Sequence, residues 1–156
     1  MIPLDNQPPG YWATNLYKEP RKRPKADAPM KELPPRAAQR FKVAREGIRA
    51  MKHVSEQVVF LGTAWKWVWM YEVSGRKLGY LHPMESSVSA TFVLTEAEER
   101  ELTGASGAPA AVHQAMRAGV VSAGVRWCWM ELQDLEAAEA FVTVIKFKHL
   151  LLSRPE

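Results

Sequence analysis

Two short stretches rich in tryptophan constrain the fold of this chain more than any other feature of its sequence. The first reads A-W-K-W-V-W-M-Y-E-V over residues 64–73, and the second reads V-R-W-C-W-M-E-L over residues 125–132. Both place an aromatic residue at every second position, which is the period of a β-strand, because successive side chains of a strand point to opposite faces of the sheet. The pattern predicts two strands and one aromatic sheet face, made of Trp65, Trp67, Trp69, Tyr71, Trp127 and Trp129.

The composition is that of a globular domain. The chain has 156 residues, of which 47% are hydrophobic and 24% are charged, enough for one domain with a substantial core. No apolar run approaches the roughly 20 residues that cross a bilayer, and the first residues lack the apolar stretch of a secretory signal. We therefore expect a cytoplasmic protein with no membrane partner. The single cysteine, Cys128, agrees with a reducing compartment, and its place within a strand predicts a buried and inert thiol.

Positive charge and proline gather in the first third of the sequence. Residues 1–53 carry a net charge of +7, whereas the remainder carries −3. Residues 1–34 show no helical or strand period and are rich in proline, which predicts an extended basic arm, with Trp12 and Tyr17 among the aromatic residues able to anchor it. Residues 35–156 are expected to form a single α+β domain.

The order of elements indicates the fold class. Apolar spacing predicts a helix from Pro35 to about Lys52 and a last helix capped by Asp134, and Thr95 with Glu98 forms the sequence signature of a capping box. Strands are predicted at residues 58–61, 64–73, 78–83, 88–94 and 125–132, with two helices between the last two of them. This order favours an α+β fold with a mainly antiparallel sheet of about four to five strands and helices packed on one face. The helices are expected to cover the aliphatic side, formed by Val68, Met70, Cys128, Met130 and Leu132.

A turn at residues 74–77 sets the register of the predicted hairpin. If Gly75 and Arg76 form a two-residue loop, Tyr80 lies opposite Tyr71 and His82 lies opposite Trp69. This register adds Tyr80 and His82 to the aromatic face.

Several of these segments, in this order, resemble a known family. The aromatic strand is followed by G-R-K-L-G-Y-L-x-P at residues 75–83, a V-x-A-x-F strand ending at Phe92, G-V-R-W at residues 124–127 and I-K at residues 145–146. Over residues 50–148 the chain resembles the bacterial family known as domain of unknown function 3788, which looks like a distant relative of frataxin-like α+β proteins. The resemblance implies a small α+β fold and assigns no catalytic residue. The arm before Pro35 lies outside the pattern.

The aromatic face is the leading candidate site. A groove of this kind holds a planar or cationic ligand by stacking and cation-π contact. The residues predicted to bind such a ligand are Trp65, Trp67, Trp69, Tyr80, His82, Arg126 and Trp127. Alternatively, the same side chains form the core or a subunit interface. The expected partner is therefore a small molecule or a protein, and the chain is expected to be a monomer or a homodimer.

Two further functions stay open at this point. The cations of the arm, Arg21, Lys22, Arg23 and Lys25, are typical of a segment that binds nucleic-acid phosphates, which makes a nucleic-acid accessory role the alternative function. An enzyme site around His82, Glu85 and Arg126 is a third possibility. His82 with Glu85 offers too few ligands for a metal ion, and the sequence holds no zinc, phosphate-loop or nucleophile-elbow motif. We therefore expect neither a metal nor a cofactor, and no catalytic residue is predicted.

Overall fold

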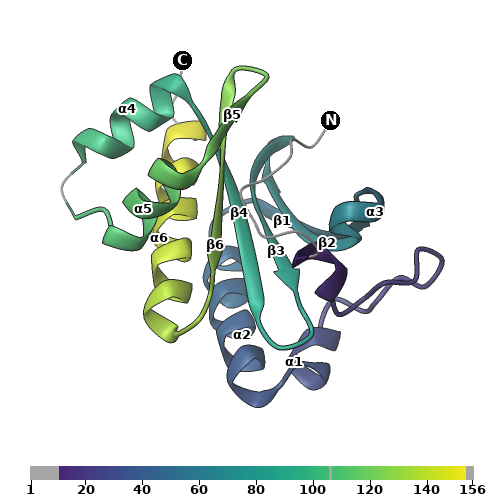
Figure 1. The fold of residues 1–156 in the computed structure, drawn as a ribbon. Helices are drawn as coiled ribbons and strands as arrows, with labels where there is room; N and C mark the ends of the chain where they lie inside the picture. The colour runs from purple at the N-terminus through teal and green to yellow at the C-terminus, as the bar shows by residue number, and fades with distance from the viewer. Residues whose placement is uncertain (1–10, 106, 154–156) are drawn as a thin grey trace.

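In the computed structural model, which describes residues 11–105 and 107–153, one six-stranded antiparallel sheet forms the centre of the molecule (Figure 1). The strand order is β1-β2-β3-β4-β6-β5. The strands are β1 (Val54–Phe60), β2 (Trp67–Val73), β3 (Arg76–Pro83), β4 (Val88–Thr95), β5 (Val120–Ser122) and β6 (Val125–Glu131). The predicted α+β class is confirmed. The strand count exceeds the expected four to five because β5 has only three residues, too few to show a period.

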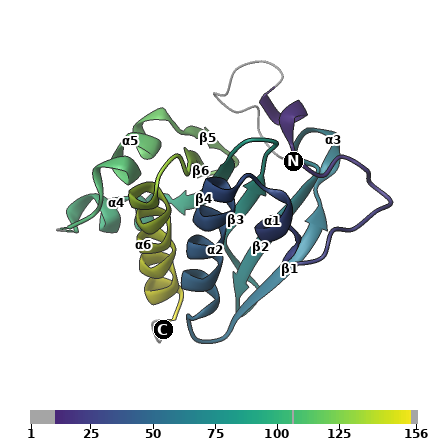
Figure 2. The ribbon, with the colours of Figure 1, turned by 90° about the horizontal axis from the view of Figure 1, so that it is seen from below.

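Helices cover one face of the sheet, and two shorter elements lie on the other (Figure 2). The two long helices, α2 (Pro35–Arg49) and α6 (Leu135–Leu152), pack side by side on the first face. Beyond them are α4 (Glu96–Gly104) and α5 (Ala110–Ala118), which contact β4 and β6 respectively. The remaining elements are the 3-10 helix η1 (Tyr11–Thr14), α1 (Ala28–Glu32) and α3 (Gly62–Trp65). No helix of the described residues combines the length and apolarity needed to span a bilayer.

Both predicted helix caps are confirmed. The Thr95 side chain accepts a hydrogen bond from the Glu98 backbone N–H at 3.1 Å, and the Thr95 N–H donates to Glu98 Oε1 at 2.9 Å. Asp134 Oδ1 accepts from the Ala137 N–H at 2.8 Å. These bonds satisfy backbone donors that the first turn of a helix leaves unpaired, and they fix where α4 and α6 begin.

The β2–β3 hairpin has a register one residue away from the predicted one. Ser74 and Gly75 form the loop, with φ values of 51° and 76°, and Val73 pairs with Arg76. A bulge between Tyr71 and Glu72 then sets Tyr80 opposite Met70 and Leu81 opposite Trp69. Because a one-residue shift turns every side chain to the other face, Tyr80 and His82 lie on the face opposite to Trp69. The predicted pairs were therefore wrong.

Trp69 and Tyr71 lie in the helix-covered core, which also corrects the prediction. Trp69 packs against Phe41 of α2, with ring centroids 5.5 Å apart and planes at 88°. The aliphatic residues of β2, Val68 and Met70, lie on the opposite face. Only the β6 part of the expected aliphatic side, Cys128 with Met130 and the following Leu132, faces the helices. The single aromatic face predicted from the sequence is thus divided between the two sides of the sheet.

The described part of the N-terminal arm belongs to the domain. Asn15 is fully buried, pairs with Met84 in an isolated β-bridge and donates from Nδ2 to the carbonyl of Trp65 at 2.9 Å. Leu33 is also buried, and Trp12 and Tyr17 pack on the body as anchors. The boundary expected at residues 34–35 therefore does not separate an arm from the domain within residues 11–34. Residues 1–10 of the predicted arm lie outside the described residues.

Candidate functional site

The face of the sheet opposite to the long helices carries a cluster of aromatic residues, which we call the aromatic cluster. β3 and β6 contribute two residues each at alternating positions, so that their side chains leave the sheet on the same side. The short η1 and α3 lie on this side and contribute one each (Figure 2). The members of the aromatic cluster are Trp12, Trp65, Tyr80, His82, Trp127 and Trp129.

Trp65 lies at the centre of the aromatic cluster because the chain leaves the strand conformation before β2 begins. Residues 62–65 form α3, and Lys66 then takes a left-handed conformation with φ of 58°. Trp65 is thereby placed against Tyr80, His82 and Trp127, at centroid distances of 5.3, 4.8 and 5.9 Å. All three contacts are edge-on, the arrangement that aromatic quadrupoles favour.

His82 is the one histidine of the aromatic cluster and is fully buried. Its Nε2 lies 2.7 Å from Thr91 Oγ1 on β4, and the Trp12 ring stands edge-on at 4.8 Å. Burial lowers the pKa of His82 to about 3. The imidazole is therefore neutral at pH 7, and it can serve as one donor and one acceptor but not as a positive charge.

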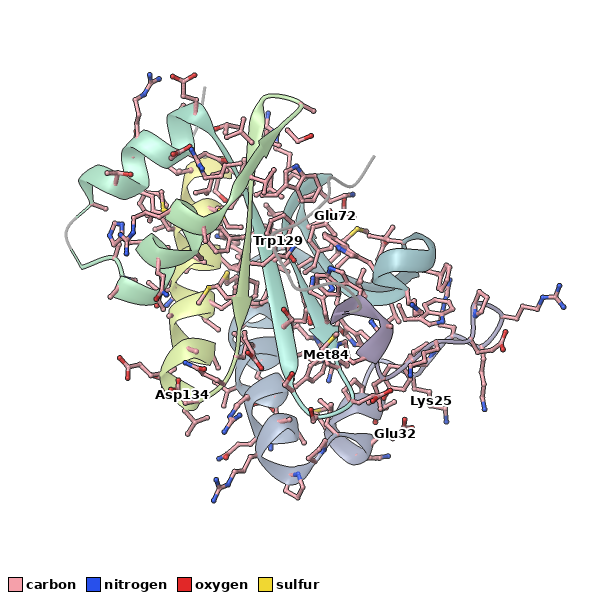
Figure 3. All side chains as sticks on the ribbon, in the orientation of Figure 1. Lys25, Glu32, Glu72, Met84, Trp129 and Asp134 are labelled. Carbon is pink, nitrogen blue, oxygen red and sulfur yellow. The ribbon has the colours of Figure 1, made fainter. Side chains whose placement is uncertain are left out.

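Three buried nitrogen atoms of the aromatic cluster have no hydrogen-bond partner among the described residues: His82 Nδ1, Trp127 Nε1 and Trp129 Nε1. Leaving a buried polar group unpaired costs roughly 1–3 kcal/mol, so most buried polar atoms are paired. Trp129 is labelled near the middle of the sheet in Figure 3. Within the described part of the chain, two unpaired indole donors and an unpaired imidazole nitrogen on one sheet face make the aromatic cluster the candidate site.

Trp67 and Trp69, which the sequence placed in the same site, are directed to the other side of the sheet. Trp67 Nε1 donates to the carbonyl of Glu19 at 2.8 Å, and Trp69 Nε1 donates to the carbonyl of Ala26 at 2.9 Å. Their indole donors are thus satisfied by the N-terminal segment. The prediction that these two residues share a face with Trp65 and Trp127 was wrong, because α3 and the alternation of β2 separate them.

Arg126 also lies apart from the aromatic cluster. It alternates with Trp127 along β6, and its Nε donates to Glu99 Oε1 at 3.0 Å while Nη1 reaches the carbonyl of Met116 at 3.3 Å. Arg126 lines a groove of about 760 Å³ between α4 and the β5–β6 hairpin. The residues of the possible enzyme site are not brought together, because His82 and Arg126 leave the sheet on opposite sides and Glu85 pairs with Lys18.

Sequence reasoning left Trp12, Thr91 and Trp129 out of the predicted ligand set. The sequence pattern could have placed Trp129 in the site, since it alternates with Trp127. No local pattern places Thr91 or Trp12 near His82, because that proximity depends on strand pairing and on the path of the N-terminal segment.

The described residues contain no group of three or more His, Cys, Asp and Glu side chains placed to share a metal ion.

Cys128 is buried on the helix side, and burial raises the pKa of its thiol to about 12. The expectation of a buried thiol is confirmed. A comparison with family models, curated proteins and solved structures finds no match to this chain.

Proposed function

We propose that this protein is a cytoplasmic binding module that holds a small neutral ligand against the aromatic cluster. The observation that carries the proposal is the set of three buried nitrogens without a partner among the described residues, His82 Nδ1, Trp127 Nε1 and Trp129 Nε1. A ligand with hydrogen-bond acceptors relieves the cost of these unpaired groups, and the surrounding rings supply apolar contact area.

The chemistry of the aromatic cluster favours a neutral ligand over a charged one. The two indole N–H groups direct partial positive charge toward a ligand, which opposes a cation despite the aromatic rings. A carboxylate or phosphate would need a compensating positive charge to offset its desolvation, and His82 is neutral because its pKa is about 3. A planar ring that bears carbonyl or similar acceptors fits both conditions.

The partial exposure of the aromatic cluster favours a small ligand. The hollow of about 280 Å³ that Trp129 borders lies between α5 and the end of β6, and no other member of the aromatic cluster lines it, so the ligand has to meet the exposed edge of the cluster. Trp127 and Trp12 are partly exposed, so the edge of the aromatic cluster is in contact with solvent. A ligand with one or two rings would approach the aromatic cluster from this edge.

The test is titration with fragments, monitored by NMR of the indole ¹⁵N–¹H groups. The panel pairs each carbonyl-bearing aromatic fragment with an analogue that lacks the carbonyl oxygen. We expect the carbonyl-bearing fragments to shift the Trp127 and Trp129 indole signals, assigned through Trp127→Phe and Trp129→Phe. The Trp69 indole signal serves as the internal control, because its N–H is already bonded to Ala26.

The proposal fails if no fragment shifts these signals below millimolar concentration. It also fails if analogues with and without the oxygen act equally, because the unpaired donors would then contribute nothing to binding. Two further parts of the proposal depend on the sequence alone. These are the cytoplasmic location and the relationship to the family known as domain of unknown function 3788.

A further inference from the structure

Residues 18–26 form an exposed loop that projects from the body, and we call this loop the basic strap. Figure 1 shows it between η1 and α1, extending away from the sheet. Its two ends are held by neighbouring tryptophans of β2, because Trp67 Nε1 donates to the carbonyl of Glu19 and Trp69 Nε1 to that of Ala26. The basic strap is thus fixed at both ends to the core of the sheet.

Four cations of the basic strap are exposed: Arg21, Lys22, Arg23 and Lys25. Within residues 11–105 and 107–153, none of them lies within salt-bridge distance of a carboxylate, whereas the neighbouring Lys18 pairs with Glu85. The Arg23 guanidinium lies over the ring of Trp67 at 5.9 Å, which holds it near the β2 end of the loop. Exposed cations without a carboxylate partner among the described residues are available to an anionic partner.

A hollow of about 560 Å³ lies between the basic strap and α1. Lys22, Arg23 and Lys25 line it together with half-buried Tyr17, and Glu19 and Glu32 are the acidic residues of its wall. Figure 3 labels Lys25 and Glu32 in this region. The hollow has the size of a small-ligand pocket, so it admits one nucleotide, while the body of a duplex does not fit.

We propose that the basic strap binds the phosphate backbone of a single-stranded nucleic acid. Phosphate contacts by lysine and arginine, with an aromatic ring close by, are the chemistry that single-strand binding proteins use. A protein partner needs apolar or aromatic anchors, and a membrane needs apolar side chains to insert. The exposed large apolar side chains of the described residues are Val121, Leu135 and Leu150, and these belong to β5 and α6.

The test measures binding of the full chain to a labelled oligo(dT) of about 12 nucleotides, a length within the usual site sizes of roughly 4–16 nucleotides. With about four phosphates neutralised, the logarithm of the affinity should fall with the logarithm of the salt concentration with a slope of about −3. We expect the variant with Arg21, Lys22, Arg23 and Lys25 each changed to glutamine to lose at least about tenfold in affinity at low salt, and to lose most of this slope.

A second variant matches the change in net charge at a different surface. In it Arg36, Lys42, Lys52 and Arg117, which are exposed on or near α2 and on α5, are changed to glutamine. We expect this control to retain affinity within about threefold and to keep most of the salt slope. An equal loss in both variants overturns the proposal, because binding would then follow net charge alone.

Two further probes identify other partners. The protein is also tested on phosphatidylserine vesicles at the same concentration of negative charge as the oligo(dT). Binding to the vesicles that is as strong as binding to oligo(dT) overturns the proposal in favour of a membrane. Equal binding to poly-glutamate overturns it in favour of an acidic protein. Normal oligo(dT) binding with no fragment shift in the aromatic cluster rejects the proposed function and leaves the basic strap proposal standing.

Discussion

His82 Nε2 lies 2.7 Å from Thr91 Oγ1 on the neighbouring strand, while its other ring nitrogen has no partner among the described residues. Burial lowers the pKa of His82 to about 3 in the folded protein, compared with about 6.5 in an unfolded chain. Below pH 6.5 the unfolded state therefore binds a proton that the folded state does not. The contribution of neutral His82 to the free energy of unfolding is fully present above this pH, and it is lost as the pH decreases toward 3.

The first prediction is a loss of about 2 kcal/mol in the free energy of unfolding between pH 7 and pH 5, caused by His82. His82→Gln removes the titrating group and should remove this part of the pH dependence. Chemical denaturation at both pH values measures it. His113→Gln, which changes a partly exposed histidine of α5, is the matched control and should behave as the unsubstituted protein. Identical pH dependence in His82→Gln would contradict the assignment.

The second prediction concerns Gly79, where helix α6 approaches β3 closely. A Cβ atom at this position would lie 2.7 Å from Ile145 Cδ1 and 2.9 Å from the backbone oxygen of Thr91. The carbonyl cannot move without disturbing the β3–β4 pairing, so Gly79→Ala should destabilise the protein by about 1–3 kcal/mol. Gly104→Ala is the control, because its Cβ meets nothing within 4 Å, and its effect should stay within about 0.5 kcal/mol. Equal denaturation midpoints for the two variants would refute the close packing.

The third prediction concerns an ion pair between α2 and β1. Arg45 Nε and Nη2 donate to the Glu56 carboxylate at 2.8 and 2.9 Å, and the Tyr71 hydroxyl donates to the same group at 2.7 Å. The Arg45 and Glu56 side chains are only 10% and 11% exposed. Glu56→Gln leaves the Arg45 charge without its partner, and the free energy of unfolding should fall by about 3–5 kcal/mol.

The control for this pair is Glu46→Gln, an exposed carboxylate on the same helix, for which a change within about 0.5 kcal/mol is expected. Urea denaturation monitored by far-UV circular dichroism measures both variants. If Glu56→Gln costs no more than Glu46→Gln, the contribution of the buried pair to stability is negligible.

The fourth prediction is that the Cys128 thiol reacts only when the protein unfolds. Its pKa is raised to about 12, mainly by burial, so almost no thiolate is present at pH 8. Labelling by a thiol-specific disulfide reagent should be slow and should accelerate with urea in parallel with unfolding. Val121→Cys in a Cys128→Ser background places a thiol at a position that is 61% exposed and should react at once. Rapid labelling of Cys128 without denaturant would be inconsistent with the burial of this side chain.

The parts of the fold that depend on local patterns were predictable from the sequence. The strand at residues 88–94 shows a clear period of two, and the Thr95 and Asp134 caps depend on side chains within three residues of the groups they bond. Such features need no information about distant parts of the chain, which is why their positions agree with the structure.

The composition of the candidate site was not predictable in the same way. Whether Tyr80 faces Met70 or Tyr71 depends on which two residues of the S-G-R-K segment form the loop and on the bulge after Tyr71. The different loop moves the pairing by two residues, which leaves the direction of the side chains unchanged, whereas the bulge moves it by one residue and reverses that direction. The proximity of Trp65 to His82 depends in addition on the left-handed conformation of Lys66, to which no local pattern points.

The path of the basic strap also affects how the molecule meets copies of itself. β1 is an outer strand of the sheet, and residues 23–26 face residues 56–59 of β1 across a gap of about 590 Å³. An uncovered outer strand can pair with the outer strand of another copy and so lead to aggregation. Proteins prevent this pairing with prolines and charged residues on or beside the outer strand. Residues 23–25 place a proline between two cations at this position, so we expect the segment that carries the cations also to limit pairing between copies of the protein.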